Sequence, residues 1–344
     1  MKIFKKITIF IAVLIITLIL FLGFKFGTRY YKKYQNEATL TNTILDNKIS
    51  SSDYREAENL KNGEILSKKI IDLSTIPPIW NAISKNNSLK DTYKYLDNIN
   101  FYVIIYKSDS LLINGIIAEP KKQGIFPVII FNRGDNKAIG SVAKFKTLYN
   151  LIVTASKLAD EDYLLIASCY REQDEFGGDD LNDVLNLTKT IKTIDKADTN
   201  RIGMYGWSRG GMMTYLSLKN STKIKTAVIG NGPTDLEALI VDRPEMEWGV
   251  YEMLIPNYEK NKKKELQKRS VINWADELDK NASLLILCGT EDEQVNPNQA
   301  DLIAKKLKEI NYNFKLEKVK TDHKFSNKKA TLNRLVINWF KENL

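Results

Sequence analysis

One short glycine-rich motif places a serine where it could act as a nucleophile. It reads Gly206-Trp207-Ser208-Arg209-Gly210-Gly211, a GxSxG pattern followed by a further glycine. The apolar run RIGMYG precedes the serine and the run GMMTYLSL follows it, which predicts a strand, a sharp turn and a helix. Such a turn exposes the hydroxyl above a sheet and directs the first helical amides towards a developing oxyanion. The alternative is an ordinary glycine-rich turn with a helix-capping serine.

A serine nucleophile needs a general base, and the sequence contains a single histidine. His323 follows the last predicted strand, and Asp292 lies just beyond the strand before it. The order serine, aspartate, histidine, each at the carboxyl end of a strand, is the triad order of α/β hydrolases. Glu291 and Asp322 are the local competitors for the role of the acid. A loop histidine or acid can also be simply solvated.

The elements that must position these residues alternate between apolar strands and helices from about residue 99 onwards. We expect a hairpin over 100–106 and 111–118, followed by strands at 127–131, 163–168, 201–205, 226–229, 283–287 and 313–319. We expect helices near 145–159, 179–194, 209–218, 298–309 and 328–341. Strands that are apolar throughout are typical of a mostly parallel, twisted sheet covered by helices on both faces. The expected class is therefore α/β.

Two segments lie outside this alternation. The insertion at 231–280 predicts a small helical cap, and its charged run Lys260–Arg269 predicts a solvated helix face. Residues 34–98 are polar and loosely patterned, and they predict a spacer and helical extension with amphipathic segments near 54–60 and 80–96. The apolar cap residues either wall a substrate pocket or pack the cap onto the domain: Met246, Trp248, Tyr251, Met253, Leu254 and Pro256.

The basic character of the chain belongs to its N-terminal segment. The sequence has 51 Lys and Arg against 42 Asp and Glu, but residues 1–33 hold seven of the bases and no acid, which leaves 44 against 42. A body this close to neutral argues against nucleic-acid binding. Ile7–Phe24 is an uncharged run of 18 residues, and as a helix it would be about 27 Å long.

We therefore expect an N-terminal transmembrane helix that acts as a single-pass signal anchor, with a cleaved secretory signal as the alternative. Lys25 and Arg29 interrupt any small-residue cleavage site, which favours the anchor. A long folded part after a short basic flank favours an extracytoplasmic catalytic domain. Two cysteines exclude a disulfide scaffold or a multi-cysteine metal site, and a bond between Cys169 and Cys288 would support an oxidising compartment.

Further segments accompany the serine and histidine motifs: Tyr170-Arg171, Asp174–Val184, Arg201–Met213, Arg243–Met246, Gly289–Asp292 and Asp322-His323. On these segments the chain from about residue 100 to its end resembles the catalytic domain of the prolyl oligopeptidase family of serine peptidases, within the α/β-hydrolase superfamily. The resemblance implies an α/β-hydrolase fold, with Ser208 as nucleophile, Asp292 as acid and His323 as base.

The chain departs from the family pattern at two points. The segment before residue 100 is too short for the β-propeller of the large members. Where the family's oxyanion turn often has Tyr or His before two glycines, this chain has Asn132-Arg133-Gly134-Asp135. We expect an amide from Arg133 or Gly134, or the Arg133 guanidinium, to replace the missing hydroxyl donor beside the amide of Arg209.

These observations predict a membrane-anchored serine hydrolase with a catalytic triad, acting on small peptides. The alternatives are a carboxylesterase or other acyl hydrolase with the same triad, and a non-catalytic binding module. We expect no metal and no cofactor, because one histidine and dispersed acids make no ligand cluster and the glycine pairs lack phosphate-loop spacing. The expected parts are an anchor at 1–33, the extension at 34–98 and the catalytic domain at 99–344. The oligomeric state is left open.

Overall fold

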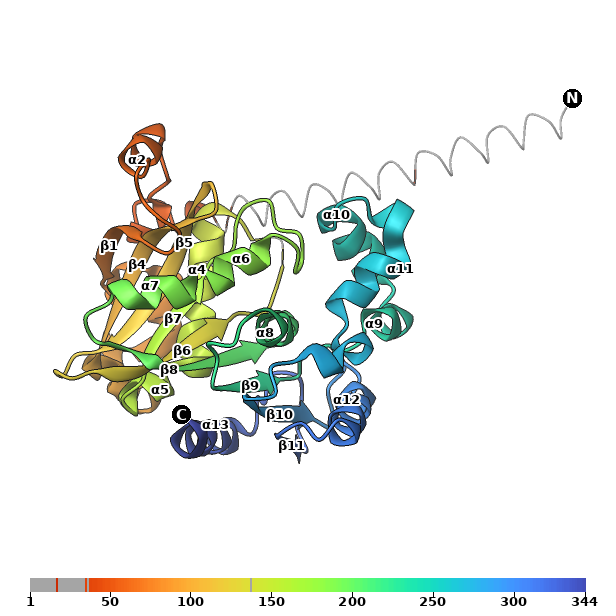
Figure 1. Ribbon diagram of the computed structural model, residues 1–344. Helices are drawn as coiled ribbons and strands as arrows, with labels where there is room; N and C mark the ends of the chain where they lie inside the picture. The colour runs from red at the N-terminus through yellow and green to blue at the C-terminus, as the bar shows by residue number, and fades with distance from the viewer. Residues whose placement is uncertain (1–16, 18–34, 36, 137) are drawn as a thin grey trace, which may run out of the picture.

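The computed structural model describes residues 17, 35, 37–136 and 138–344. Within them, nine strands form one sheet in the order β1-β4-β5-β7-β6-β8-β9-β10-β11 (Figure 1). The strands of this sheet are β1 Ile65–Ile71, β4 Ile99–Ser108, β5 Leu111–Pro120, β6 Phe126–Asn132, β7 Leu164–Ser168, β8 Ala197–Trp207, β9 Thr226–Gly230, β10 Ser283–Gly289 and β11 Phe314–Val319. A separate small hairpin pairs β2 Ser84–Lys85 with β3 Ser88–Leu89.

Helices connect the strands and cover the sheet. The α-helices are α2 Ser51–Glu56, α3 Pro77–Ile83, α4 Gly140–Asn150, α5 Lys157–Asp160, α6 Asp180–Leu185, α7 Leu187–Thr190, α8 Arg209–Asn220, α9 Leu236–Asp242, α10 Glu252–Leu254, α11 Tyr258–Arg269, α12 Asn298–Glu309 and α13 Lys329–Asn343. The 3-10 helical segments are η1 Ile44–Asp46, η2 Leu73–Thr75, η3 Asp91–Asn98, η5 Ile191–Thr193, η7 Val271–Asn273 and η8 Ala275–Glu277. Two π-helical turns are η4 Leu151–Ala155 and η6 Glu247–Tyr251.

The sheet changes from antiparallel to parallel along its width. β1, β4, β5 and β7 pair antiparallel, and every pair from β7 through β6 and β8 to β11 is parallel. One face carries the core shared with α6, α7, α8 and α12, and the other carries the core shared with α3, α4, α5 and α13. The predicted mostly parallel sheet with helices on both faces is therefore confirmed. The loops that follow β6, β8, β10 and β11 meet at one edge, because the carboxyl ends of parallel strands lie together.

The segment before residue 99 differs from the helical extension that we expected. β1 pairs antiparallel with β4 and forms the edge of the main sheet. Its sequence, ILSKKII, does not alternate, and Lys68, Lys69 and Ile70 are exposed, so the strand lacks the usual period-two signal. The expected helix over 80–96 is broken because Asn86 and Asn87 both adopt positive φ and turn the chain into the β2–β3 hairpin.

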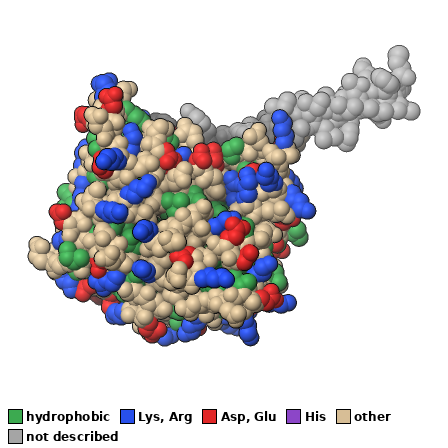
Figure 2. All heavy atoms as spheres, in the orientation of Figure 1, with side chains coloured by type: hydrophobic (Ala, Val, Ile, Leu, Met, Phe, Trp, Pro, Cys, Tyr) green, Lys and Arg blue, Asp and Glu red, His purple; other side chains and the backbone are tan. Residues whose placement is uncertain are grey.

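The insertion at 231–280 is helical, as predicted. It contains α9, η6, α10 and α11, which lie beside the sheet at the right of Figure 1. The lysines of α11 face solvent, and basic side chains cover this part of the surface in Figure 2. Within the described residues, no helix is both long and apolar enough to span a bilayer. The predicted anchor helix, Ile7–Phe24, lies outside the described residues except for Thr17.

Candidate active site

Ser208 lies in the sharp turn between β8 and α8 that the GxSxG motif predicts. Its backbone has φ 54° and ψ −124°, a conformation that costs free energy for any residue with a Cβ. The turn needs glycine on both sides. A Cβ on Gly210 would lie 1.9 Å from the carbonyl oxygen of Asn132, and one on Gly206 would lie 2.1 Å from that of Gly210. The motif therefore lets strand, turn and helix approach closely enough to expose the serine.

His323 and Asp292 form a buried pair at the neighbouring strand ends. Nδ1 of His323 lies 2.7 Å from Oδ2 of Asp292, and both residues are less than a tenth exposed. The other carboxylate oxygen of Asp292 accepts the backbone N–H groups of Gln294 at 2.7 Å and Val295 at 3.0 Å. The carboxylate is thus held by its own loop, and this fixes the direction from which it meets the imidazole.

The two competing acids face elsewhere. The Asp322 carboxylate accepts the backbone N–H and the hydroxyl of Ser326, both at 2.7 Å, and so closes its own turn. These bonds hold the pKa of Asp322 below its ordinary value, led by the Ser326 backbone N–H. Glu291 is exposed and lies 3.8 Å from the Lys320 ammonium. Of the three acids considered from the sequence, Asp292 is the one bonded to His323.

Ser208 and His323 line one cavity of about 380 Å³. Gly134 and Arg209 line it too, whereas Asp292 and Arg133 do not. Apolar side chains form part of its wall: Phe176, Trp207, Pro233, Leu239, Met246 and Val295. Of the apolar cap residues considered from the sequence, Met246 belongs to this wall. Tyr251 is buried in the core, and Trp248 and Met253 are more than half exposed.

The turn after β6 packs directly against the serine. A Cβ on Gly134 would lie 2.9 Å from the carbonyl oxygen of Trp207 and 3.2 Å from Cβ of Ser208, so only glycine fits there. The expectation that the Arg133 guanidinium could act as a donor in the cavity is wrong. This group is fully buried, and it donates to the carbonyl oxygens of Gly134 and Cys169, each at 3.1 Å. A main-chain amide of this turn remains the candidate donor.

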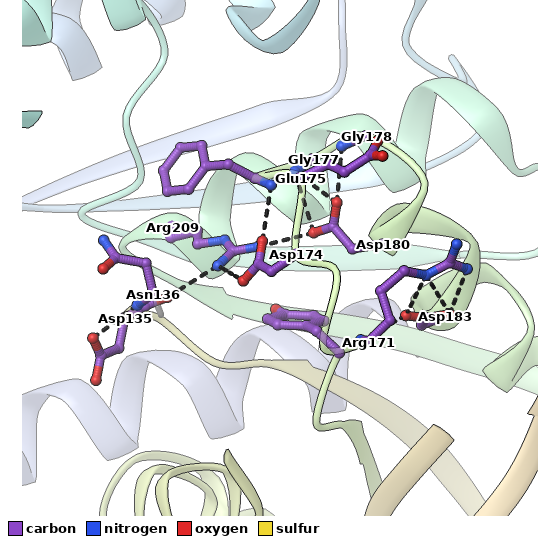
Figure 3. A network of polar contacts seen from close by, with 12 residues as sticks. Asp135, Asn136, Arg171, Asp174, Glu175, Gly177, Gly178, Asp180, Asp183 and Arg209 are labelled. Carbon is purple, nitrogen blue, oxygen red and sulfur yellow. Dashed lines mark hydrogen bonds and ion pairs between the residues drawn. The ribbon is translucent and has the colours of Figure 1, made fainter. Parts of the chain in front are cut away.

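A buried ion network, which sequence reasoning missed, surrounds the side chain of Arg209 (Figure 3). Its guanidinium donates to both oxygens of Asp174 at 2.6 Å and to Asp180 at 2.8 Å. It also donates to the carbonyl oxygen of Asp135 at 3.4 Å, and it lies 4.7 Å from the ring centre of Phe176. One side chain next to the serine therefore links α8 to the loops after β6 and β7.

Burial acts differently on the two acids of this network. It raises the pKa of Asp180 above the ordinary 3.8, although Arg209 and the amides of Gly177 and Gly178 act in the opposite direction. Burial also opposes ionisation of Asp174, but Arg209 outweighs it and holds the pKa of this carboxyl below its ordinary value. The sequence feature that could have indicated this network is the presence of Asp174 and Asp180 on either side of Gly177-Gly178, together with Arg209 directly after the serine.

The described residues form neither a metal site nor a disulfide. They contain no group of three or more His, Cys, Asp or Glu side chains arranged to hold a metal ion. Cys169 and Cys288 are both buried free thiols, so the disulfide that would have supported an oxidising compartment is not formed. Burial raises the pKa of Cys288 to about 11, which keeps this thiol protonated.

Comparison with known proteins settles the family. Residues 170–344, just over half of the chain, match the model of the prolyl oligopeptidase family. The chain belongs to this family. Its members are serine peptidases, and the chain is accordingly a serine hydrolase of the peptidase type. The resemblance read from the motifs is thereby confirmed.

Individual relatives are distant. An uncharacterized peptidase of Bacillus subtilis, YtmA, is 23% identical over 220 residues, which cover 62% of this chain and 81% of YtmA. The acylaminoacyl peptidase of Pyrococcus horikoshii superposes with a TM-score of 0.61 at 21% identity, over 75% of this chain. The chain spans 44% of that enzyme's length. Esterase B of Lactobacillus rhamnosis gives a TM-score of 0.56 at 12% identity, over 72% of this chain and 86% of the esterase. These likenesses show the α/β-hydrolase fold.

Proposed function

We propose that the chain hydrolyses small peptides through an acyl-enzyme on Ser208. The observation that carries this proposal is the His323–Asp292 pair, whose histidine lines the same cavity as the serine of the strained turn. A nucleophile, a base and an acid that orients the base are the components of acyl transfer by a serine enzyme.

The proposed reaction follows from which atoms are already engaged. Because Asp292 accepts the proton on Nδ1 of His323, Nε2 is the nitrogen left to take the proton from Ser208. The serine oxygen attacks the substrate carbonyl, and the protonated imidazole then gives its proton to the leaving amine. Water repeats the sequence on the acyl-enzyme and frees the serine. Asp292 stays ionised throughout and stabilises the imidazolium.

The oxyanion of each tetrahedral intermediate needs donors beside the serine. We assign this role to the backbone N–H of Arg209 and to an amide of the Arg133–Gly134 turn. Two observations support the assignment: Arg209 is the first residue of α8, and the Gly134 backbone lies so close to the serine turn that a Cβ there would be 3.2 Å from Cβ of Ser208. The positive end of the helix adds to the stabilisation of a negative oxygen there.

The shape of the cavity supports a small substrate with an apolar side chain next to the scissile bond. Its volume of about 380 Å³ is at the lower end of the usual range for small-molecule sites. Phe176, Leu239, Met246 and Val295 make part of its lining apolar. The cap thus contributes Leu239 and Met246 to the surface that a substrate side chain would contact.

An esterase with the same triad is the second candidate, because the superposition on Esterase B covers most of that enzyme. We would measure kcat/KM on aminoacyl nitroanilides and on nitrophenyl acyl esters with matched apolar acyl groups. A peptidase hydrolyses both, whereas an esterase hydrolyses only the esters. The Ser208→Ala variant is the control, and activity that survives it would come from another protein or another site. A preparation inert to both substrates would favour the third candidate, a non-catalytic binding module.

We further propose that residues 1–33 anchor the enzyme in a membrane with the catalytic domain outside the cytoplasm. The support is the uncharged run of 18 residues between basic flanks. Resistance of the full chain to carbonate extraction, lost when residues 1–33 are removed, tests the anchor. Digestion of the domain by protease added to intact cells tests its side, and a protected domain would contradict it.

A further inference from the structure

Asn231 joins the end of β9 to the ends of β10 and β11, which carry the acid and the base. It follows β9, is 6% exposed, and has a positive φ of 46°. Its backbone N–H donates to the carbonyl oxygen of Leu287 in β10 at 2.9 Å. Its side-chain oxygen accepts the N–H of Gly289 at 2.8 Å, and its side-chain nitrogen donates to the carbonyl oxygen of His323 at 2.9 Å.

The backbones of the loops after β10 and β11 are hydrogen-bonded to each other up to Thr321, the residue before the turn of His323. Thr290 donates to Val319 at 2.9 Å, and Glu291 donates to Thr321 at 3.0 Å. A Cβ on Gly289 would lie 2.8 Å from the carbonyl oxygens of both Thr321 and Asp322, so the two loops are in close contact there. Beyond Thr321 the backbone leaves this ladder and turns back.

The turn that contains His323 is rigid within itself. Phe325 donates to the carbonyl oxygen of Asp322 at 3.1 Å, and the Asp322 carboxylate holds Ser326. Internal bonds of this kind fix the shape of a turn, whereas its place on the sheet depends on contacts with other elements. The buried ring of Phe325 packs against Trp207, with ring centres 5.5 Å apart, and the imidazole is bonded to Asp292. The Asn231 amide connects the backbone of His323 itself to the ends of β9 and β10, which lie side by side in Figure 1.

We propose that Asn231 is a positioning residue for the general base. The inference rests on the proposed function of His323, and it adds a residue outside the triad to that function. The position requires a side chain with one donor and one acceptor at the distance of an asparagine, on a backbone at positive φ, which asparagine tolerates better than most residues. Loss of the amide removes the hydrogen bond that holds the His323 carbonyl group, while the bond to Asp292 and the buried Phe325 ring remain. We expect the backbone of His323 to shift relative to Ser208, and a displacement of about 1 Å costs about 100-fold in rate.

The test compares Asn231→Gly with Asn186→Ala. The glycine removes both side-chain bonds and keeps the positive φ. Asn186 is a matched control, because it is also a buried asparagine whose side-chain nitrogen donates to a neighbour, Ser108 Oγ at 3.0 Å, and it does not line the cavity. We expect Asn231→Gly to lower kcat about 100-fold while KM stays within threefold of the wild-type value. We expect Asn186→Ala to leave kcat and KM unchanged, although it lowers Tm by about as much as Asn231→Gly does.

A spectroscopic readout separates positioning from stability. Because the chain has a single histidine, its imidazole nitrogens give an unambiguous signal after labelling with 15N-histidine. We expect the hydrogen-bonded Nδ1–H signal of the folded wild type to broaden or disappear in Asn231→Gly and to persist in Asn186→Ala. Unchanged kcat and an unchanged signal in a folded Asn231→Gly variant would overturn the proposal.

A second variant keeps the test decisive if the glycine does not fold. Asn231→Asp retains the acceptor for Gly289 and replaces the donor to His323 by an oxygen, so we expect the same loss of kcat. Full activity of this variant would overturn the proposal. Labelling with a fluorophosphonate distinguishes a failure of this inference from a failure of the proposed function. If the probe does not label the wild type at Ser208, the proposed function is refuted. A labelled wild type with equally fast labelling of both Asn231 variants refutes only the inference.

Discussion

Replacing Asp292 by asparagine should leave the loop intact and disable the base. One oxygen of Asp292 accepts two backbone N–H groups, from Gln294 and Val295, and the other faces Nδ1 of His323. The oxygen of an asparagine must therefore stay on the side of the two amides, and its NH₂ group must face the ring. The ring nitrogen Nδ1 then has to accept, which puts the proton on Nε2. In this tautomer Nε2 cannot accept the proton of Ser208.

The size of the effect follows from the alternative orientation of the asparagine. Turning its oxygen towards His323 would restore the productive tautomer but would leave two backbone N–H groups facing an NH₂ group. Each unpaired buried donor costs about 1–3 kcal/mol, so the productive state lies about 2–6 kcal/mol higher. At about 1.4 kcal/mol per factor of ten, this predicts a loss between about 30-fold and 10⁴-fold, with the upper part close to the loss expected of a triad with the wrong tautomer.

The measurement pairs kinetics with the tautomer itself. We expect kcat/KM of Asp292→Asn on a nitrophenyl ester to fall by between about 30-fold and 10⁴-fold, with Tm close to that of the wild type. The single 15N-labelled histidine should change from the Nδ1–H to the Nε2–H form. Asp292→Ala removes the carboxylate without imposing a tautomer and serves as the comparison. The reasoning is refuted if Asp292→Asn keeps more than a tenth of wild-type activity, or if it keeps the Nδ1–H tautomer.

Two further predictions concern stability. Gly210→Ala should lower the free energy of unfolding by about 3 kcal/mol, because its Cβ would meet the Asn132 backbone, whereas Gly249→Ala, with no atom within 4 Å, should cost nothing. Urea denaturation checks both, and equal stability of the two variants would contradict the packing argument. The pKa of Asp180 is raised in the folded state above the ordinary 3.8. Above pH 3.8 the unfolded chain therefore releases a proton that the folded protein still binds. The stabilisation that Asp180 contributes to the folded state falls as the pH rises from 3.8 through the folded pKa. The stability difference between wild type and Asp180→Asn should therefore narrow over that interval, and a difference independent of pH would contradict the assigned pKa direction.

The parts of the molecule that could be predicted are those whose signal is local. The parallel strands are continuous apolar runs, and the serine motif carries its own turn geometry in its glycines. His323 and Asp292 could be proposed because each follows a strand whose carboxyl end had to lie at one edge of the sheet. β1 escaped prediction because an edge strand with exposed lysines has no period-two pattern.

The parts that could not be predicted depend on partners that only the fold brings together. Arg209 meets Asp174 across 35 positions in sequence, and Asn231 meets His323 across 92. Nothing in the local sequence of an arginine or an asparagine reports a partner at that distance. The expectation that the Arg133 guanidinium is a donor in the cavity was wrong for the same reason, because its acceptor, the carbonyl oxygen of Cys169, lies at the end of another strand.

The most direct test of the account is the site of reaction with a fluorophosphonate probe. The purified protein is labelled, digested and analysed by mass spectrometry, with Ser208→Ala and His323→Ala treated alongside. We predict a single phosphonylated peptide with the adduct on Ser208, no adduct in Ser208→Ala, and labelling in His323→Ala slower by about 10³-fold or more. Labelling that survives the loss of Ser208, or that proceeds at the wild-type rate without His323, would contradict the central claim.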